Sequence, residues 1–226
     1  MSILVNFISD SIQFFYNITA ISGIPNYGFA IILFTVFIKL LLFPLTSIQV
    51  KSMRAMQELQ PKLKEIQTKY KNDQQKAQQA MMELYQKNKV NPFSGCLPLL
   101  VQMPILFALF TALRTFFDPK LHPAYVNLEH ATFFWIPNLG VPDPLYILPI
   151  LAAVFTFVQQ KASTPNNTDP TQKTMLYIMP LFMGWIAKSF ASGLALYWVV
   201  YSIVSALEQF LLKKQRIVAK EEVAER

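Results

Sequence analysis

The sequence has little of what most soluble enzymes rely on. Its 226 residues include one cysteine, two histidines and six glycines, and only 15% are charged. The single cysteine, Cys96, excludes an internal disulfide framework and a cysteine-based zinc site. His122 and His130 share one loop and lack further ligands at metal-binding spacing. GxGxxG, phosphate-binding-loop and GxSxG motifs are absent. We therefore expect no catalytic residue, no cofactor and no metal.

Hydrophobic residues are abundant instead. They make up 53% of the chain, which contains 19 Phe and 9 Met, whereas a soluble globular chain carries about 25% charged residues and less Phe. The composition predicts a membrane protein. The net charge of +7 comes largely from short segments between hydrophobic runs, so lipid headgroups are the expected counter-charge, with ribosomal RNA second and no role for DNA.

Five windows are long and apolar enough to predict membrane-spanning helices, for which about 20 apolar residues are needed. The third and fourth windows are short and would require flanking residues or local thinning of the bilayer. The predicted fold is an all-α polytopic membrane protein with spans at residues 27–48, 93–117, 145–161, 174–187 and 192–212.

The distribution of basic residues predicts the orientation. Sixteen of the twenty Lys and Arg residues fall in segments on one side of the predicted spans, and three fall on the other. Because basic loops stay in the cytoplasm, we expect the carboxyl terminus, with its basic tail at residues 213–226, to be cytoplasmic. Five spans then place the amino terminus outside, together with the loop at residues 118–143.

Two polar segments flank the first span. Residues 1–26 alternate apolar and polar faces at helical spacing and lack the basic region of a cleavable signal; they predict an amphipathic helix in the outer interface, while a sixth span would conflict with the charge count. Residues 49–91 contain two amphipathic stripes separated by Asn72 and Asp73, which predicts a cytoplasmic helical hairpin. The stripes consist of Met53, Met56, Leu59, Leu63, Ile66 and Tyr70, and of Ala77, Ala80, Met81, Leu84 and Tyr85. Its Met-rich stripe is either the hairpin's own core or an adaptable binding surface.

Lys39 lies near the middle of the first predicted span, too deep for its ammonium to reach the headgroups easily. Insertion scales put the free energy of such a charge at about 2.5–3.5 kcal/mol. Counting residues from the span ends puts Glu208 closer to the cytoplasm, so a direct ion pair is not expected. Gln102 lies at the depth of Lys39, and Gln159 and Gln160 lie near the inner end of the third span. These side chains predict a hydrated cavity open to the cytoplasm; interhelical hydrogen bonding is the alternative for each glutamine.

Four stretches carry a resemblance to a known family. They read FIKLLLFPLTSIQVKSMRAMQELQPKLKEIQTKY, NKVNPFSGCLPLLVQMPILFAL, DPLYILPILAAVFTFVQQK and SGLALYWVVYSIVSALEQ. Together they resemble the YidC-type membrane protein insertases, a family with related members in mitochondria and chloroplasts. The resemblance covers residues 27–213, in order and in the expected spans.

The resemblance implies five helices around a hydrophilic groove that is open to the cytoplasm and to lipid, with a functional cytoplasmic hairpin. Its groove carries a basic residue at the position of Lys39, usually arginine in bacterial members. Lysine keeps the charge but loses the planar donor fork. Gln102, Gln160, Tyr197 and Trp198 match groove or client-contact positions. Many relatives have an anchor helix with a large external domain or a lipoprotein signal, so this chain resembles a minimal form or one without its leader.

The expected function is insertion and chaperoning of client proteins in the bacterial plasma membrane, without any covalent step. The expected partners are nascent or small membrane-protein clients and membrane lipids, with the general secretory channel and the ribosome as further candidates. The alternative is a small polytopic transporter or channel, which would need a polar path to both faces. The outer halves of the spans are apolar and aromatic and contain no repeat. An intramembrane enzyme would need a nucleophile–base pair, which the spans lack.

Overall fold

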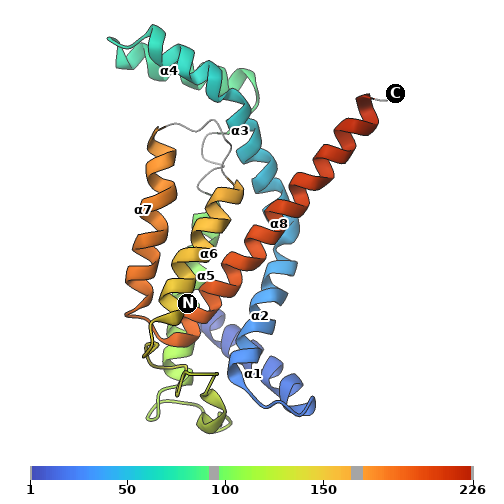
Figure 1. Ribbon diagram of the computed structural model, residues 1–226, viewed down its shortest axis with the longest axis vertical. Coiled ribbons are helices and arrows are strands. Elements are labelled where there is room, and N and C mark those ends of the chain that lie inside the picture. The colour runs from blue at the N-terminus through green and yellow to red at the C-terminus, as the bar shows by residue number, and fades with distance from the viewer. Residues whose placement is uncertain (1, 92–96, 164–169, 225–226) are drawn as a thin grey trace. The chain divides into compact units, whose positions relative to one another are not determined.

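The protein is all-helical in the computed structural model, which describes residues 2–91, 97–163 and 170–224. The predicted all-α class is therefore confirmed for this part of the chain. Phe133 and Ile136 form an isolated β-bridge that lies outside any strand. The helices in Figure 1 are α1 (Ser2–Ile21), α2 (Tyr27–Leu41), α3 (Phe43–Lys69), α4 (Gln74–Lys87), α5 (Leu97–Phe116), the 3₁₀ helix η2 (Leu128–Ala131), α6 (Ile147–Ser163), α7 (Pro170–Ala187) and α8 (Ser192–Ala224).

The first predicted span is divided between two helices. α2 ends at Leu41 and α3 begins at Phe43, with Pro44 in its first turn. Proline lacks a backbone N–H and its ring excludes a preceding helical carbonyl, so it is tolerated in a first turn but interrupts a continuous helix. The break also separates two compact units, residues 1–41 with 104–226 and residues 42–103. It places Lys39 in the last turn of α2.

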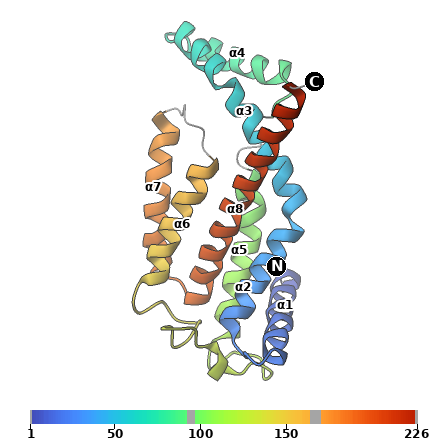
Figure 2. The same ribbon diagram turned by 45° about the vertical axis from the view of Figure 1, so that its right-hand side comes forward.

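In the larger unit, α8 packs against α2 and α6, α7 packs against α6, and α1 packs against α2. Figure 2 shows α6 and α7 running side by side. Their close approach depends on Gly184, where an added Cβ would lie 2.9 Å from the Cβ of Ala153. The core consists of buried apolar side chains from α1, α2, α5, α6 and α8, among them Ile12, Phe34, Leu109 and Tyr197.

The loop between α5 and α6 is held by specific hydrogen bonds. Asp143 is 3% exposed, and its carboxylate accepts hydrogen bonds from the Trp135 indole and from the backbone N–H of Leu148 at the start of α6. The backbone amides of Ser192 and Gly193 donate to carbonyls of the same loop at 2.7 and 2.8 Å. The loop is thereby fixed to the amino-terminal ends of both α6 and α8.

The described helices differ in how well they meet the requirements for a membrane span. Among the described helices, α8 is long and apolar enough at residues 192–212 to cross a membrane. The helices α2 and α3 meet the same criteria only if they are counted together as one broken span. Three apolar segments are shorter, at residues 101–116, 147–163 and 173–187. These segments overlap the remaining predicted spans, whose role as membrane spans stays a prediction.

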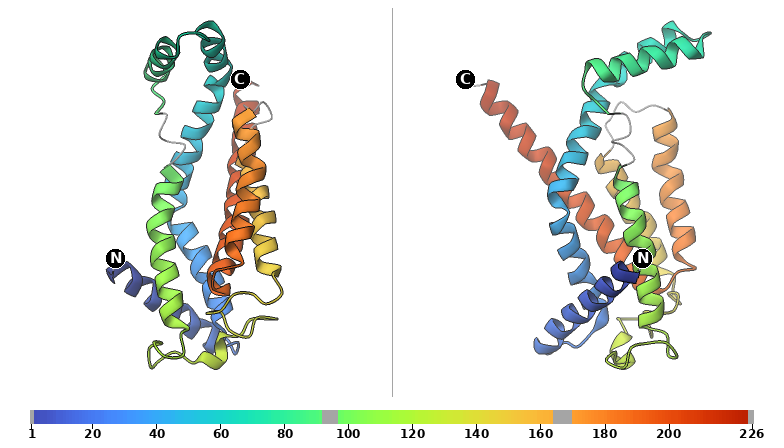
Figure 3. Two further views of the ribbon diagram at one scale, coloured as in Figure 1. Left: turned by 90° about the vertical axis from the view of Figure 1, so that its left-hand side faces the viewer. Right: turned by 180° about the vertical axis from the view of Figure 1, so that it is seen from behind.

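In the smaller unit, α3 and α4 pack against each other as the two arms of a hairpin (Figure 3). Leu59 and Leu63 of α3 and Ala77 of α4 are buried, and all three belong to the stripes identified in the sequence. Asp73 caps α4, and its carboxylate accepts a 3.0 Å hydrogen bond from the Lys76 amide. This backbone hydrogen bond lowers the pKa of Asp73 below its ordinary value of 3.8.

Replacing Asp73→Ala should loosen the first turn of α4, because the Lys76 amide loses its acceptor. We expect hydrogen–deuterium exchange of that amide to accelerate roughly fivefold at neutral pH, whereas Asp73→Asn, which also caps helices well, should leave it nearly unchanged. Since the pKa of Asp73 is lower in the folded hairpin, its stabilisation is present above the ordinary pKa and is lost as the pH falls below 3.8. Equal exchange in the Ala and Asn variants would show that the cap does not matter.

Candidate functional site

One face of α8 carries polar and aromatic side chains through the otherwise apolar stretch at residues 192–212. Tyr197, Tyr201, Ser205 and Glu208 follow one another at spacings of four, four and three residues, which places them on one side of the helix. Tyr197 and Glu208 are buried. The neighbouring helix α2 carries the other half of the site, because its buried face continues from Ile31 through Thr35 to Lys39.

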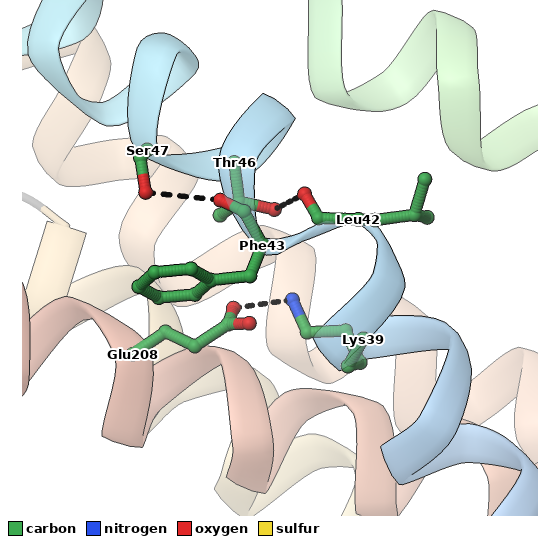
Figure 4. Close-up of polar contacts among 6 residues, drawn as sticks. All are labelled: Lys39, Leu42, Phe43, Thr46, Ser47 and Glu208. Carbon is green, nitrogen blue, oxygen red and sulfur yellow. Dashed lines mark hydrogen bonds and ion pairs between the residues drawn. The ribbon is translucent and has the colours of Figure 1, made fainter.

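Lys39 and Glu208 form a buried ion pair. The Nζ atom of Lys39 lies 2.5 Å from Oε2 of Glu208, and the two side chains are 4% and 8% exposed. Figure 4 shows them pointing toward each other from α2 and α8. A charge removed from water is tolerated when an opposite charge neutralises it at this distance, and removing one partner leaves an uncompensated charge, typically at about 3–5 kcal/mol.

The expectation that Lys39 has no direct acidic partner is therefore wrong. It rested on counting residues from the ends of two predicted spans as if both helices were parallel and ended at residues 48 and 212. In the structure α2 ends at Leu41, and α8 continues to Ala224. The two helices also cross obliquely (Figure 1). Depth counted along one helix then does not transfer to the other.

One aromatic ring contacts the ammonium group, and two further rings pack against that ring. The Nζ atom of Lys39 lies 4.6 Å from the centroid of the Tyr201 ring, a cation–π distance. The Tyr201 ring in turn contacts the rings of Tyr197 and Trp198, at centroid distances of 5.9 and 6.2 Å. The Trp198 indole donates a 3.0 Å hydrogen bond to the hydroxyl of Thr156 on α6. The site thus joins α2, α8 and α6 through one charged and aromatic cluster.

Five of the six predicted site residues belong to the larger unit, where they form two groups. Lys39, Tyr197 and Trp198 belong to the cluster just described. Gln159 and Gln160 lie at the carboxyl-terminal part of α6 and are half-buried; the Gln159 carbonyl accepts a hydrogen bond from the Ser163 hydroxyl.

The sixth predicted residue, Gln102, belongs to the other compact unit, on α5, and is 8% exposed. The position of Gln102 relative to Lys39 stays a prediction.

The first turn of α3, in the same unit, is supported by side-chain hydrogen bonds. The hydroxyls of Thr46 and Ser47 donate to the carbonyls of Leu42 and Phe43 (Figure 4).

Three residues of the cluster were not selected from the sequence. Glu208 could have been found, because it is the acid within the predicted spans and a buried acid needs a cation. Tyr201 lies one turn from Tyr197, so helical periodicity pointed to it. Thr156 carried no signal, since a threonine in an apolar helix commonly bonds its own backbone.

The cluster contains one ammonium group, the carboxylate that is paired with it, and the aromatic rings around Tyr201. Across the described residues, no group of three or more His, Cys, Asp or Glu side chains is placed to hold a metal ion. The hydroxyl of Ser202, one residue from Tyr201, is buried and has no hydrogen-bond partner among the described residues.

Known proteins resemble this chain over most of its length. A family model described as 60Kd inner membrane protein matches residues 17–220. A membrane protein insertase YidC of Oceanobacillus iheyensis is 46% identical, with the match covering 90% of this chain and 81% of that protein. A membrane protein insertase YidC of Geobacter sulfurreducens is 43% identical, but this chain spans only 36% of its length.

A solved structure has the same fold. The crystal structure of an active YidC insertase with its first transmembrane domain resolved matches with a TM-score of 0.69 at 28% identity, over 89% of this chain and 45% of that one. The structural match supports the helical fold described above, and the family model covers most of the chain. The chain therefore belongs to the YidC family of membrane protein insertases, the family whose model is described as 60Kd inner membrane protein.

Proposed function

We propose that this chain inserts client proteins into the bacterial plasma membrane and helps them fold there. The observation that carries the proposal is Lys39, a cation held within apolar helix packing in a chain whose relatives are named insertases. A client's polar segment must cross a barrier of several kcal/mol for each charge. A polar groove that contains this ammonium group would shorten the dry part of that path, and no bond is made or broken.

Five spans form the proposed membrane core, namely the broken helix pair α2 and α3, then α5, α6, α7 and α8. The helices carry many exposed large apolar side chains, including Leu181 and Trp185 of α7 at 71% and 63% exposure, as expected for lipid-facing surfaces. The shorter segments have 15–17 residues and so reach about 23–26 Å at 1.5 Å per residue, less than a hydrocarbon core of about 30 Å. A bilayer thinned to match them would also shorten the client's path.

The groove is proposed to open to the cytoplasm and to close outside. The excess of Lys and Arg in the hairpin and tail supports this orientation, with the amino terminus outside and the carboxyl terminus in the cytoplasm. The hydrogen-bonded loop around Asp143 would then lie outside and cover that end of α6 and α8. One open end lets a polar segment enter without opening a pore.

Lys39 is proposed to attract client carboxylates, with Gln102, Gln159 and Gln160 offering hydrogen bonds to the polar segment. Tyr197 and Trp198 would contact the client through amphipathic rings, which tolerate both apolar and polar neighbours. Because each contact is weak, a client could be released into lipid. The hairpin of α3 and α4 is proposed to receive clients at the cytoplasmic face, beside the secretory channel or the ribosome.

A small transporter or channel is the competing function. It would require polar groups continuing to the outer end of the bundle, where the described residues instead include the apolar and aromatic side chains of Phe116, Phe117 and Ile136. This packing favours an insertase with a one-sided groove.

Purified protein in liposomes should insert a small single-span client with a short translocated tail, since the proposed groove needs no energy source. We expect protease-protected client to exceed that in protein-free liposomes by roughly tenfold, a difference of about 1.4 kcal/mol in barrier. Lys120→Ala, which removes an exposed loop cation, should insert equally well and serves as the control. Insertion no better than in protein-free liposomes would reject the proposed function.

Sidedness can be measured with single cysteines in a Cys96→Ser background. Lys39→Cys and Gln102→Cys should react with a water-soluble maleimide added from the cytoplasmic side and not from the outside. Trp185→Cys should react from neither side, because we propose that this side chain faces lipid. Equal labelling of positions 39 and 102 from both faces would indicate a channel.

A further inference from the structure

We propose that Glu208 is an internal ligand that occupies the ammonium group of Lys39 until a client carboxylate replaces it. Glu208 would then set the preference of the site for acidic clients. The inference rests on the proposed insertase function and names the residue that regulates its charged site. It follows from the buried pair itself, because Lys39 cannot be an empty anion site while Glu208 lies 2.5 Å away.

The pair removes a difficulty in the simpler view of a lone lysine waiting for a client. An unpaired ammonium group with 3% of its residue surface exposed would be poorly solvated before any client arrived. With Glu208 in place, the resting site is neutral overall. A client carboxylate that enters exchanges one ion pair for another, so the buried ammonium group has a partner before and after the exchange.

Glu208 lies at the middle of α8, two turns after Tyr201 on the same face of the helix. A displaced carboxylate would leave toward the carboxyl-terminal part of α8, the end that the proposed orientation places in the cytoplasm.

Tyr201 would keep the ammonium group in place during the exchange. Its ring centroid lies 4.6 Å from the Nζ atom, and this cation–π contact does not require Glu208. The geometry also indicates the class of ligand. A lysine ammonium is a compact charge without the planar fork of arginine, so it suits a single carboxylate such as an Asp or Glu side chain in the client's translocated segment.

The test compares two clients that differ only in whether the translocated segment carries Asp and Glu or the matching Asn and Gln. The measured quantity is the ratio of acidic to neutral client inserted in liposomes, together with the thermal stability of each variant. Glu208→Gln should raise this ratio about tenfold, equivalent to about 1.4 kcal/mol, because the internal competitor is gone. Glu129→Gln, at an exposed glutamate on η2, is the matched control and should change neither quantity.

Two further variants separate this role from a structural one. Lys39→Ala alone should lower stability, because Glu208 stays buried without a partner. Lys39→Ala with Glu208→Gln should recover that stability but bring the client ratio to about one, since no charge remains to distinguish the clients.

A purely structural pair gives a different pattern. Glu208→Gln would then reduce insertion of both clients in parallel with stability, and the double variant would restore both at the original ratio. Either result overturns the proposal. If the unmodified protein inserts neither client, the proposed insertase function is rejected. That outcome differs from the two patterns above, which reject the role of Glu208 alone.

Discussion

The buried ion pair between Lys39 and Glu208 is the interaction that constrains the rest of the site. Two opposite charges in an apolar environment must stay in contact, because separating them leaves each without solvation. This requirement fixes the crossing of α2 and α8 at one point and orients the face of α8 that carries Tyr197 and Tyr201. Through Trp198 and Thr156 the same constraint extends to α6. The proposed function, which uses the charge of Lys39, would have to exchange this contact.

The break at Leu42 places the cation of this pair in the last turn of α2. If α2 continued as one helix to residue 48, Lys39 would lie in the helix interior, several turns from any end. Pro44 cannot continue the hydrogen bonding of α2 but fits the first turn of a new helix, and Lys39 consequently lies in the last turn. A cation near the carboxyl-terminal end of a helix also interacts favourably with the helix dipole. The local backbone and the ion pair therefore favour the same arrangement.

The rigid loop and the hairpin illustrate two ways of ordering polar segments. Asp143 is buried, and its carboxylate accepts hydrogen bonds from a side-chain and a backbone donor. The loop is therefore tied to the helical core by hydrogen bonds that are shielded from water. The hairpin is stabilised instead by apolar stripes and a cap at Asp73 that remains close to solvent. A segment of the second kind opens more readily, which agrees with a proposed role in receiving varied clients.

The sequence by itself determined the all-helical class, the apolar segments, the hairpin with its turn at Asn72 and Asp73, and the family. Each of these depends on composition, periodicity or a sequence motif within one stretch of chain. It also singled out Lys39, because an isolated charge in an apolar run is visible without any fold. Only the tertiary structure decided what Lys39 contacts. The pairing with Glu208 joins residues 169 positions apart, and it depends on where α2 ends, how α8 is inclined and how far two side chains extend. None of these is encoded in the residues next to either charge, so counting along single helices placed the two groups apart.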